Sequence, residues 1–207
     1  MLKILGRATS INVRKVMWAA AEVGVASERE DWGLPLRDPK VPEFMALNPN
    51  GQVPVIIDDG FVLWESNAIL LYLGEKYGKG GVLPANVQQR ALVQQWLGWQ
   101  ATELGAYSGY PVHALIRKTP GYEDPARLAD AIARWTRTME ILEAQVAKTG
   151  AFIGGDAFSV ADIAIGLTVH RWFSVPIERV ALPAVVDYYE RVKARPAGAE
   201  VMTAATP

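Results

Sequence analysis

The pattern of apolar residues changes near residue 80, and this change limits the folds open to the chain. Before it, short apolar runs of strand length alternate with segments of helical periodicity, whereas after it the strong signals are helical. A glycine-rich segment, Tyr77–Gly81, separates the two parts. The 207 residues are enough for two small domains. We therefore predict an α/β domain over residues 1–79 and an all-α domain over residues 86–207.

The first part predicts the order βαβ, an irregular segment and then ββα. The hairpin is indicated by two apolar runs that flank Asp58-Asp59-Gly60, a turn sequence. The expected elements are strands at 2–5, 27–31, 55–57 and 61–63, a helical turn from residue 42, and helices at 12–23 and 66–76. This order is compact and resembles a thioredoxin-like fold.

The second part has the pattern of helices alone. One is expected from 87 to about 107, two more begin at 125 and at 160, and a last helix begins at 183 and ends before Pro196. The clearest begins at Asp124-Pro125 and ends at Gly150, with an apolar stripe along one face. Ser159 and Asp162 have the spacing of a capping box before an apolar helix. We interpret this box as a folding element without a role in chemistry.

Charge and composition exclude several functional classes. The formal net charge of -1 offers no general attraction for nucleic acid or an anionic membrane surface. No apolar run approaches the roughly 20 residues needed to cross a bilayer, and the first residues are interrupted too early for a signal peptide, so a cytoplasmic location is expected. The chain has no cysteine, which rules out protein disulfides, zinc–thiolate sites and cysteine nucleophiles. No metal site is expected, and thiol chemistry here needs a sulfur that a ligand supplies.

Two short segments are predicted to meet at one edge of the small sheet. Residues 48–54 read Asn-Pro-Asn-Gly-Gln-Val-Pro, a loop entering a strand, and residues 64–67 read Trp-Glu-Ser-Asn, where a strand ends and a helix begins. Ser66 stands where it can cap that helix, and a helix N-terminus attracts anions. The arrangement suits a short, charged, peptide-like ligand. The alternative is a plain loop end at Val53-Pro54 and an ordinary cap beside an exposed acid at Glu65.

Four segments in order resemble the cytosolic glutathione transferases, over nearly the whole chain. They are residues 9–16 (Thr-Ser-Ile-Asn-Val-Arg-Lys-Val), 48–54, 64–69 (Trp-Glu-Ser-Asn-Ala-Ile) and 158–162 (Phe-Ser-Val-Ala-Asp). The detail is most similar to the serine-type theta and phi classes and their bacterial relatives. The resemblance implies an N-terminal thioredoxin-like domain, an all-helical C-terminal domain, and glutathione as a co-substrate with no permanently bound cofactor. It also implies a homodimer, with exposed apolar groups such as Phe61 or Trp64 available for the contact.

The resemblance assigns the middle of the glutathione molecule to the Val53-Pro54 step. In such folds this peptide bond is usually cis, which turns the Val53 backbone outward. Its N–H and C=O then pair with the extended ligand as an added strand would. Gln52 is implied as a further contact.

The two charged ends of the ligand are assigned to other residues. By resemblance, the γ-glutamyl carboxylate lies at Ser66 and the helix N-terminus, and Glu65 faces the neighbouring ammonium. Lys40 stands where phi-like relatives have a lysine for the glycyl carboxylate. The histidine that is frequent just before that lysine is Pro39 here, so this corner of the site departs from the family pattern.

Ser10 is the predicted catalytic residue, and Asn12 is its rival. A thiol has a pKa near ~8.5, so little of it is ionised at neutral pH. A hydroxyl that donates a hydrogen bond to sulfur, at the start of a helix, favours the thiolate. Ser10 is therefore expected to act as a donor and not as a nucleophile, although Ser10 or Asn12 also suits a simple helix cap. The Asn12 amide is a second candidate donor, since some bacterial relatives rely on an asparagine there.

The second substrate is expected between the two domains, in a largely apolar pocket. The residues in the corresponding segment are Ala106, Tyr107, Tyr110, His113 and Arg117. Tyr107, Tyr110 and Arg117 suit hydrogen bonding to negative charge that develops on the acceptor. Aromatic residues at this spacing also suit a helix core, and His113 by itself is more typical of a structural residue.

Three functions remain open at this point. The first is glutathione transfer, in which the ionised thiol attacks a small hydrophobic electrophile, as in detoxification. The second is another glutathione-dependent reaction at the same site, either isomerisation, peroxide reduction or disulfide reduction; a chain without cysteine disfavours mechanisms with a protein mixed disulfide. The third is a non-catalytic binding protein of the same fold.

Overall fold

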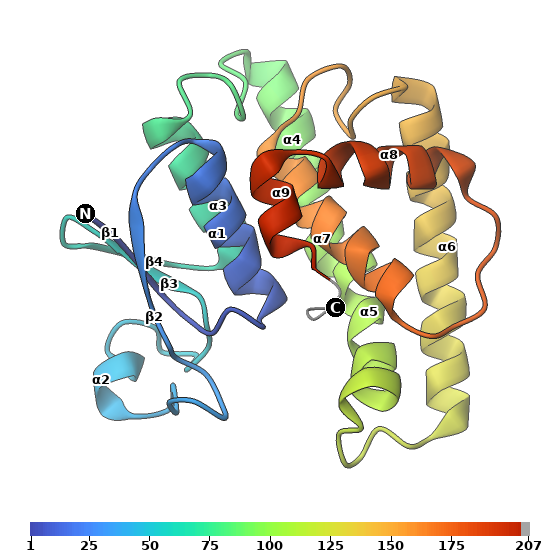
Figure 1. Cartoon of the computed structure of the whole chain (residues 1–207), viewed down its shortest axis with the longest axis horizontal. Coiled ribbons are helices and arrows are strands. Elements are labelled where there is room, and N and C mark those ends of the chain that lie inside the picture. Colours follow the sequence, from blue (N-terminus) through green and yellow to red (C-terminus); the bar gives the residue numbers. More distant parts are fainter. Residues whose placement is uncertain (204–207) are drawn as a thin grey trace. The chain divides into compact units, whose positions relative to one another are not determined.

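The computed structural model describes residues 1–203 and consists of two compact units (Figure 1). The first unit comprises residues 1–84, and the second comprises the described residues from Ala85 onward. The division falls inside the segment 80–85 that separates the two predicted domains. The last four residues of the predicted helical domain, 204–207, lie outside the described residues.

The first unit is a thioredoxin-like fold on a four-stranded mixed sheet in the order β2-β1-β3-β4. Strand β1 runs parallel to β2 and antiparallel to β3, and β3 pairs antiparallel with β4. The elements are β1 (Leu2–Leu5), α1 (Ile11–Glu22), β2 (Ser27–Glu30), α2 (Pro42–Met45), β3 (Val55–Asp58), β4 (Phe61–Trp64) and α3 (Ser66–Tyr77). The predicted order of strands and helices is thus confirmed.

Both faces of this sheet are covered. Helices α1 and α3 pack against each other, and α1 buries the apolar stripe that contains Val13 and Val16. A second cluster joins Leu5 and Val55 of the sheet to Trp32 and to Phe44 of α2. The connection from β4 to α3 is thereby held at the same end of the sheet as the loop that precedes β3.

The second unit is all-helical, as predicted. Its elements are α4 (Val87–Trp99), η1 (Gln100–Leu104), α5 (Gly105–Pro111), η2 (Val112–Arg117), α6 (Pro125–Thr149), α7 (Val160–Ser174), α8 (Pro183–Lys193) and α9 (Pro196–Val201). Asp124 caps α6 by accepting hydrogen bonds from the N–H groups of Ala126 and Arg127, and Gly150 ends it in the left-handed conformation. Ser159 and Asp162 form the predicted capping box.

Two boundaries of the predicted helices were wrong. The helix expected to end near Tyr107 continues without interruption through Arg117, because two π-helical segments, η1 and η2, keep the chain helical on either side of α5 and past Pro111. The helix that ends before Pro196 is not the last one, since α9 begins at Pro196. A proline in the first turn is compatible with a new helix because its missing N–H has no partner there in any case.

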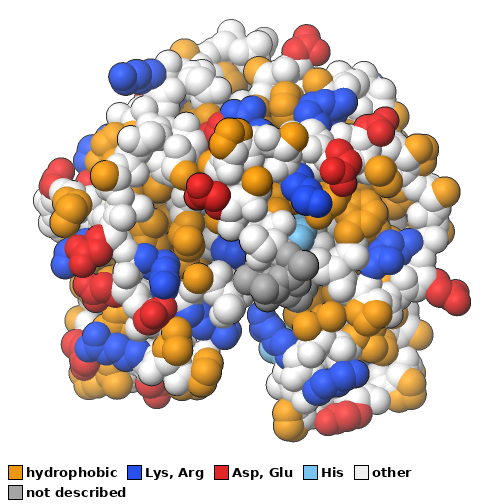
Figure 2. All heavy atoms as spheres, in the orientation of Figure 1, with side chains coloured by type: hydrophobic (Ala, Val, Ile, Leu, Met, Phe, Trp, Pro, Cys, Tyr) orange, Lys and Arg blue, Asp and Glu red, His pale blue; other side chains and the backbone are white. Residues whose placement is uncertain are grey.

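Charged and apolar side chains are intermixed on the face of the molecule drawn in Figure 2. Acidic and basic groups are interspersed there, which fits the formal net charge of -1. Among residues 1–203, the helices all fall short of the length and apolarity that a membrane span requires.

Candidate active site

The loop before β3 is shaped by Asn48. Its buried side chain donates from Nδ2 to the carbonyl oxygen of Gln52 at 2.8 Å and accepts, at Oδ1, from the backbone N–H of Asn50 at 3.0 Å and from Asn50 Nδ2 at 2.9 Å. One asparagine therefore satisfies both sides of the turn, which is the common use of this residue in loops. The loop presents Gln52 and Val53 at the sheet edge.

Gly51 brings Lys40 to this loop. Its φ of 58° lies in the left-handed region, and a Cβ placed there would lie 3.2 Å from the Pro39 carbonyl oxygen and 3.3 Å from Lys40 Cγ. Only glycine avoids both the strain and the contact. The aliphatic part of the Lys40 side chain thus lies against the 48–54 loop, although Lys40 as a whole is exposed to solvent.

The Val53–Pro54 peptide bond is cis, as predicted. In the part of the chain that the structure describes, no hydrogen bond involves the backbone of Val53. The turn after β1 approaches the same point, since a Cβ at Gly6 would lie 2.4 Å from Val13 Cγ2 and 3.2 Å from Val53 Cβ. The Val53 backbone is therefore available to pair with an extended ligand.

The start of α3 forms the second side of the site. Ser66 is the first residue of α3 and is buried, and the N-cap position belongs to Glu65. The prediction that Ser66 caps the helix was therefore wrong by one residue: its hydroxyl makes no cap bond and instead donates to Asn12 Oδ1 at 3.4 Å. Glu65 has a φ of 72°, a conformation that is rare outside glycine and that clusters at functional sites.

These two segments meet in one small pocket of about 30 Å³. Six of the predicted site residues line it together with two that the prediction left out. The lining residues are Asn12, Asn48, Asn50, Gln52, Val53, Pro54, Glu65 and Ser66. The two that were missed, Asn48 and Asn50, stand within the same sequence motif, and the signal for them was the asparagine at each side of Pro49.

Ser10 and Lys40 are not among the residues that line this pocket. Ser10 occupies the N-cap position of α1, yet its side chain makes no cap bond, so the interpretation of Ser10 as a mere cap loses its support. Its backbone N–H donates to the Arg7 carbonyl at 3.1 Å and its carbonyl accepts from Arg14 N–H at 2.9 Å, which fixes the turn and leaves the hydroxyl available. Asn12 lies within the first turn of α1 and in the pocket wall.

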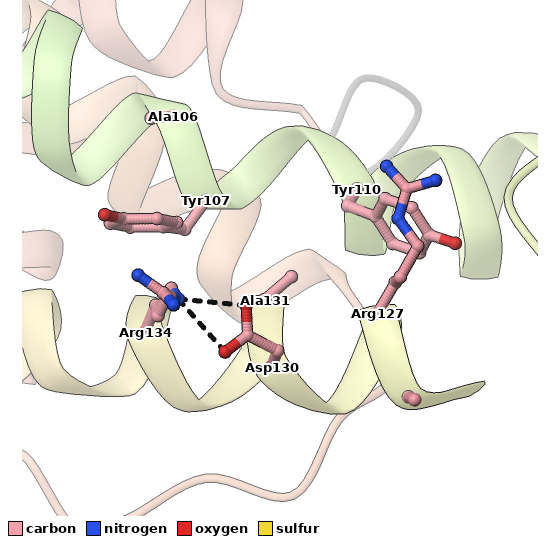
Figure 3. A pocket seen from close by; sticks show the side chains of 8 residues that line it. Ala106, Tyr107, Tyr110, Arg127, Asp130, Ala131 and Arg134 are labelled. Atoms are coloured by element: carbon pink, nitrogen blue, oxygen red, sulfur yellow. Dashed lines mark hydrogen bonds and ion pairs between the residues drawn. The ribbon is translucent and has the colours of Figure 1, made fainter. Parts of the chain in front are cut away.

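The helical unit has a pocket of its own, of about 540 Å³, between α5 and α6 (Figure 3). Three residues of the predicted electrophile segment line it: Ala106, Tyr107 and Tyr110. The other lining residues, Ala126, Arg127, Asp130, Ala131 and Arg134, come from α6 and were not predicted.

Charged groups of α6 lie against the two tyrosines of this pocket. Arg127 lies over the ring of Tyr110 at 5.1 Å, and Arg134 lies 5.8 Å from the ring centre of Tyr107 while pairing with Asp130 at 2.9 Å. Figure 3 shows both tyrosines directed from α5 toward these side chains. The pocket is thus lined by aromatic and aliphatic groups together with two arginines and one aspartate.

His113 and Arg117 are not among the lining residues of that pocket. His113 Nδ1 lies 2.9 Å from Thr119 Oγ1, and its ring stacks on Tyr122 at 4.5 Å, so it holds the turn after η2 in place. Burial lowers the pKa of His113, and the positive charges of Arg117 and Arg171 lower it further. A histidine held neutral in this way is consistent with the structural role suggested by the sequence.

Comparison with known proteins tests these interpretations. Residues 1–75 match the family model for the glutathione S-transferase N-terminal domain, and residues 125–191 match that for the glutathione S-transferase C-terminal domain. Glutathione S-transferase GstB of Escherichia coli strain K12 is 31% identical over 204 residues, which is 98% of each chain. The chain belongs to the glutathione S-transferase family.

Two further relatives are similar to this glutathione S-transferase. The crystal structure of the theta class glutathione S-transferase from Xanthomonas axonopodis pv. citri with glutathione bound superposes with a TM-score of 0.92, at 36% identity and with 99% of each chain covered. The disulfide-bond oxidoreductase YfcG of E. coli K12 is 34% identical over 172 residues, or 78% of this chain and 76% of that protein. The bacterial theta-class resemblance is thereby confirmed.

Proposed function

We propose that this transferase binds glutathione along the two segments that form this pocket, the 48–54 loop and the start of α3, and ionises its thiol for attack on a small hydrophobic electrophile. The observation that carries the proposal is the convergence of Val53, with its backbone unpaired, and the Glu65–Ser66 pair on one small pocket. A strand-like partner and an anion site beside the same pocket suit a short peptide with a terminal carboxylate.

In this proposal each part of glutathione has a partner. The cysteinyl backbone pairs with Val53 next to Pro54, with Gln52 as a further contact. The γ-glutamyl carboxylate accepts hydrogen bonds from Ser66 and from N–H groups at the start of the 12-residue helix α3, while Glu65 pairs with the adjacent ammonium. Lys40, held against the loop by Gly51, receives the glycyl carboxylate.

Ser10 donates a hydrogen bond to the sulfur and favours the thiolate. Lowering the thiol pKa by about two units needs about 2.7 kcal/mol of preferential stabilisation. One hydrogen bond to a charged acceptor together with the N-terminus of α1 is of that order. Asn12 competes for the role because it lines the pocket and Ser10 does not.

The test is a titration with glutathione at neutral pH, followed by the ultraviolet absorption of the thiolate. We expect a saturable thiolate signal in the wild-type protein, its loss in Ser10→Ala and its retention in Asn12→Ala. The reverse result would transfer the role to Asn12. Binding in calorimetry without any thiolate signal would contradict the transferase proposal.

The electrophile is expected in the helical unit, against Tyr107 and Tyr110, whose hydroxyls suit a developing negative charge. His113 and Arg117 stay predictions for this role, although they do not line the α5–α6 pocket. The homodimer also stays a prediction: Phe61 is half exposed and available for a contact, whereas Trp64 is partly buried against the core cluster. The cytoplasmic location stays a prediction as well.

Glutathione-dependent disulfide reduction is the second candidate. The relative named as a disulfide-bond oxidoreductase supports it, at 34% identity over 78% of this chain. Because the chain has no cysteine, such a reaction would use two glutathione molecules in place of a protein thiol. Rapid turnover of a small disulfide together with slow conjugation of an aryl halide would favour this candidate.

A further inference from the structure

A lysine lies buried directly behind the proposed carboxylate site. Lys15, one turn beyond Asn12 on α1, is 3% exposed, and its Nζ lies 3.2 Å from Asn67 Oδ1 and 3.5 Å from Ser66 Oγ. An apolar side chain would fill the same buried space without the free-energy cost of removing an ammonium group from water. The position of this cation therefore calls for a functional explanation.

Ser66 connects Lys15 to the pocket. It is the first residue of α3 and lines the pocket, and its hydroxyl oxygen accepts from Lys15 while its proton is donated to Asn12 Oδ1 at 3.4 Å. A hydroxyl that accepts from an ammonium is a stronger donor, because the bonds of such a chain polarise one another. The Ser66 hydroxyl is thus a strengthened hydrogen-bond donor for an anion that enters the pocket.

The charges near this point act in the same direction. The N-terminus of α3 carries a partial positive charge, and Lys15 adds a full one on the protein side of Ser66. Glu65, on the other side of the helix start, is exposed and lines the pocket. A ligand with a carboxylate next to an ammonium matches this order of charges.

We propose that Lys15 is a positioning residue that acts through Ser66 to strengthen binding of the ligand carboxylate at the start of α3. The inference rests on the proposed glutathione site and adds a residue that does not line the pocket. Ser66 donates to Asn12 Oδ1 in the structure; when the ligand binds, the same hydroxyl donates its hydrogen bond to the carboxylate oxygen, while Lys15 still donates to the hydroxyl oxygen.

The test is a double-mutant cycle in which calorimetry measures the Kd for glutathione. Lys15→Met removes the charge and keeps most of the volume, Ser66→Ala removes the hydroxyl, and the double variant measures their coupling. We expect Lys15→Met to weaken binding about ten-fold, which is about 1.4 kcal/mol. In the Ser66→Ala background the same substitution should weaken binding less than about three-fold.

Lys3→Met is the matched control, because Lys3 lies on β1 of the same unit, is partly exposed and pairs with Glu30 at 3.5 Å. It removes one positive charge away from the pocket and should leave the Kd unchanged. If Lys15→Met does not fold, Lys15→Gln supplies a neutral side chain that can still donate to Asn67.

The outcomes distinguish a failure of the Lys15 inference from a failure of the proposed glutathione site. Equal Kd values in wild type and Lys15→Met, or an undiminished effect in the Ser66→Ala background, would overturn the role of Lys15 acting through Ser66. A wild-type protein that binds no glutathione at millimolar concentration would instead overturn the proposed function, and this inference with it.

Discussion

Replacement of Asp162 by alanine should destabilise the helical unit strongly without affecting glutathione binding. The Asp162 carboxylate is fully buried and accepts four hydrogen bonds, from the N–H groups of Ile153 and Ser159 at 2.8 Å each, from Ser159 Oγ at 2.9 Å and from the Tyr188 hydroxyl at 3.1 Å. Alanine would remove the acceptor of these four buried hydrogen bonds, although the Tyr188 hydroxyl would keep the main-chain carbonyl oxygen of residue 162 at 3.5 Å. A stranded buried donor costs about 1–3 kcal/mol, but the variant no longer has to bury a carboxylate.

The balance of these two effects is an expected loss of about 3 kcal/mol at pH 7. For a chain of about 200 residues, 1 kcal/mol corresponds to roughly 2–4 °C, so the Tm should fall by about 9 °C. Differential scanning calorimetry measures the Tm, and isothermal calorimetry measures the glutathione Kd below the transition. The Kd should stay the same, because all partners of Asp162 belong to the helical unit and the proposed ligand contacts belong to residues 1–84.

Asp124 offers a matched control. It also caps a helix, α6, but its side chain is exposed and its two backbone partners have access to water. Asp124→Ala should therefore cost only about 1 kcal/mol, the usual value for an N-cap. If both aspartates cost the same, or if Asp162→Ala lowers the Tm by less than about 3 °C, the argument from stranded buried donors would be refuted.

The Asp162 carboxyl also predicts a pH dependence, because burial raises its pKa to about 6 although the hydrogen bonds oppose that shift. The folded-state pKa thus lies above the unfolded value of 3.8. The stability advantage of wild type over Asp162→Ala, measured by urea unfolding, should therefore be larger near pH 4 and shrink by about 2 kcal/mol as the pH rises to 6. Glu65→Gly should keep or slightly raise the Tm, because glycine adopts a positive φ without strain, and a lower Tm would contradict backbone strain at this position. The same variant should weaken glutathione binding about ten-fold in calorimetry. Asp58→Asn should cost about 2 kcal/mol at neutral pH, because the buried Asp58 accepts hydrogen bonds from Lys76 and from two tyrosine hydroxyls of α3. Burial alone raises the pKa of Asp58, but these bonds hold it below its usual value, so the advantage of aspartate should be lost as the pH falls below about 4; an advantage that persists there in urea unfolding would refute the charge argument.

Local patterns carried most of the fold. Helix α6 shows this: its apolar stripe, its aspartate cap and its terminal glycine each depend on residues close together in the chain, so they can be predicted from the sequence. The errors arose near prolines, because a proline can lie within a helix, end one or begin one. Pro111 lies inside a continuous helix in which π-helical segments flank α5, and Pro196 begins a short helix that was not predicted.

The sequence by itself determined the family, the two-part architecture and the two motifs that line the pocket between the 48–54 loop and the start of α3, because each of these depends on residues close together in the chain. Only the tertiary structure decided how the motifs act on each other. It joined Asn12 and Lys15 of α1 to Ser66 of α3, more than 50 residues away, and gave Asn48 its position inside the loop. The physical reason is that a hydrogen bond depends on distances of a few ångströms in space, and these follow from the packing of helices on a sheet and leave no periodicity in the sequence.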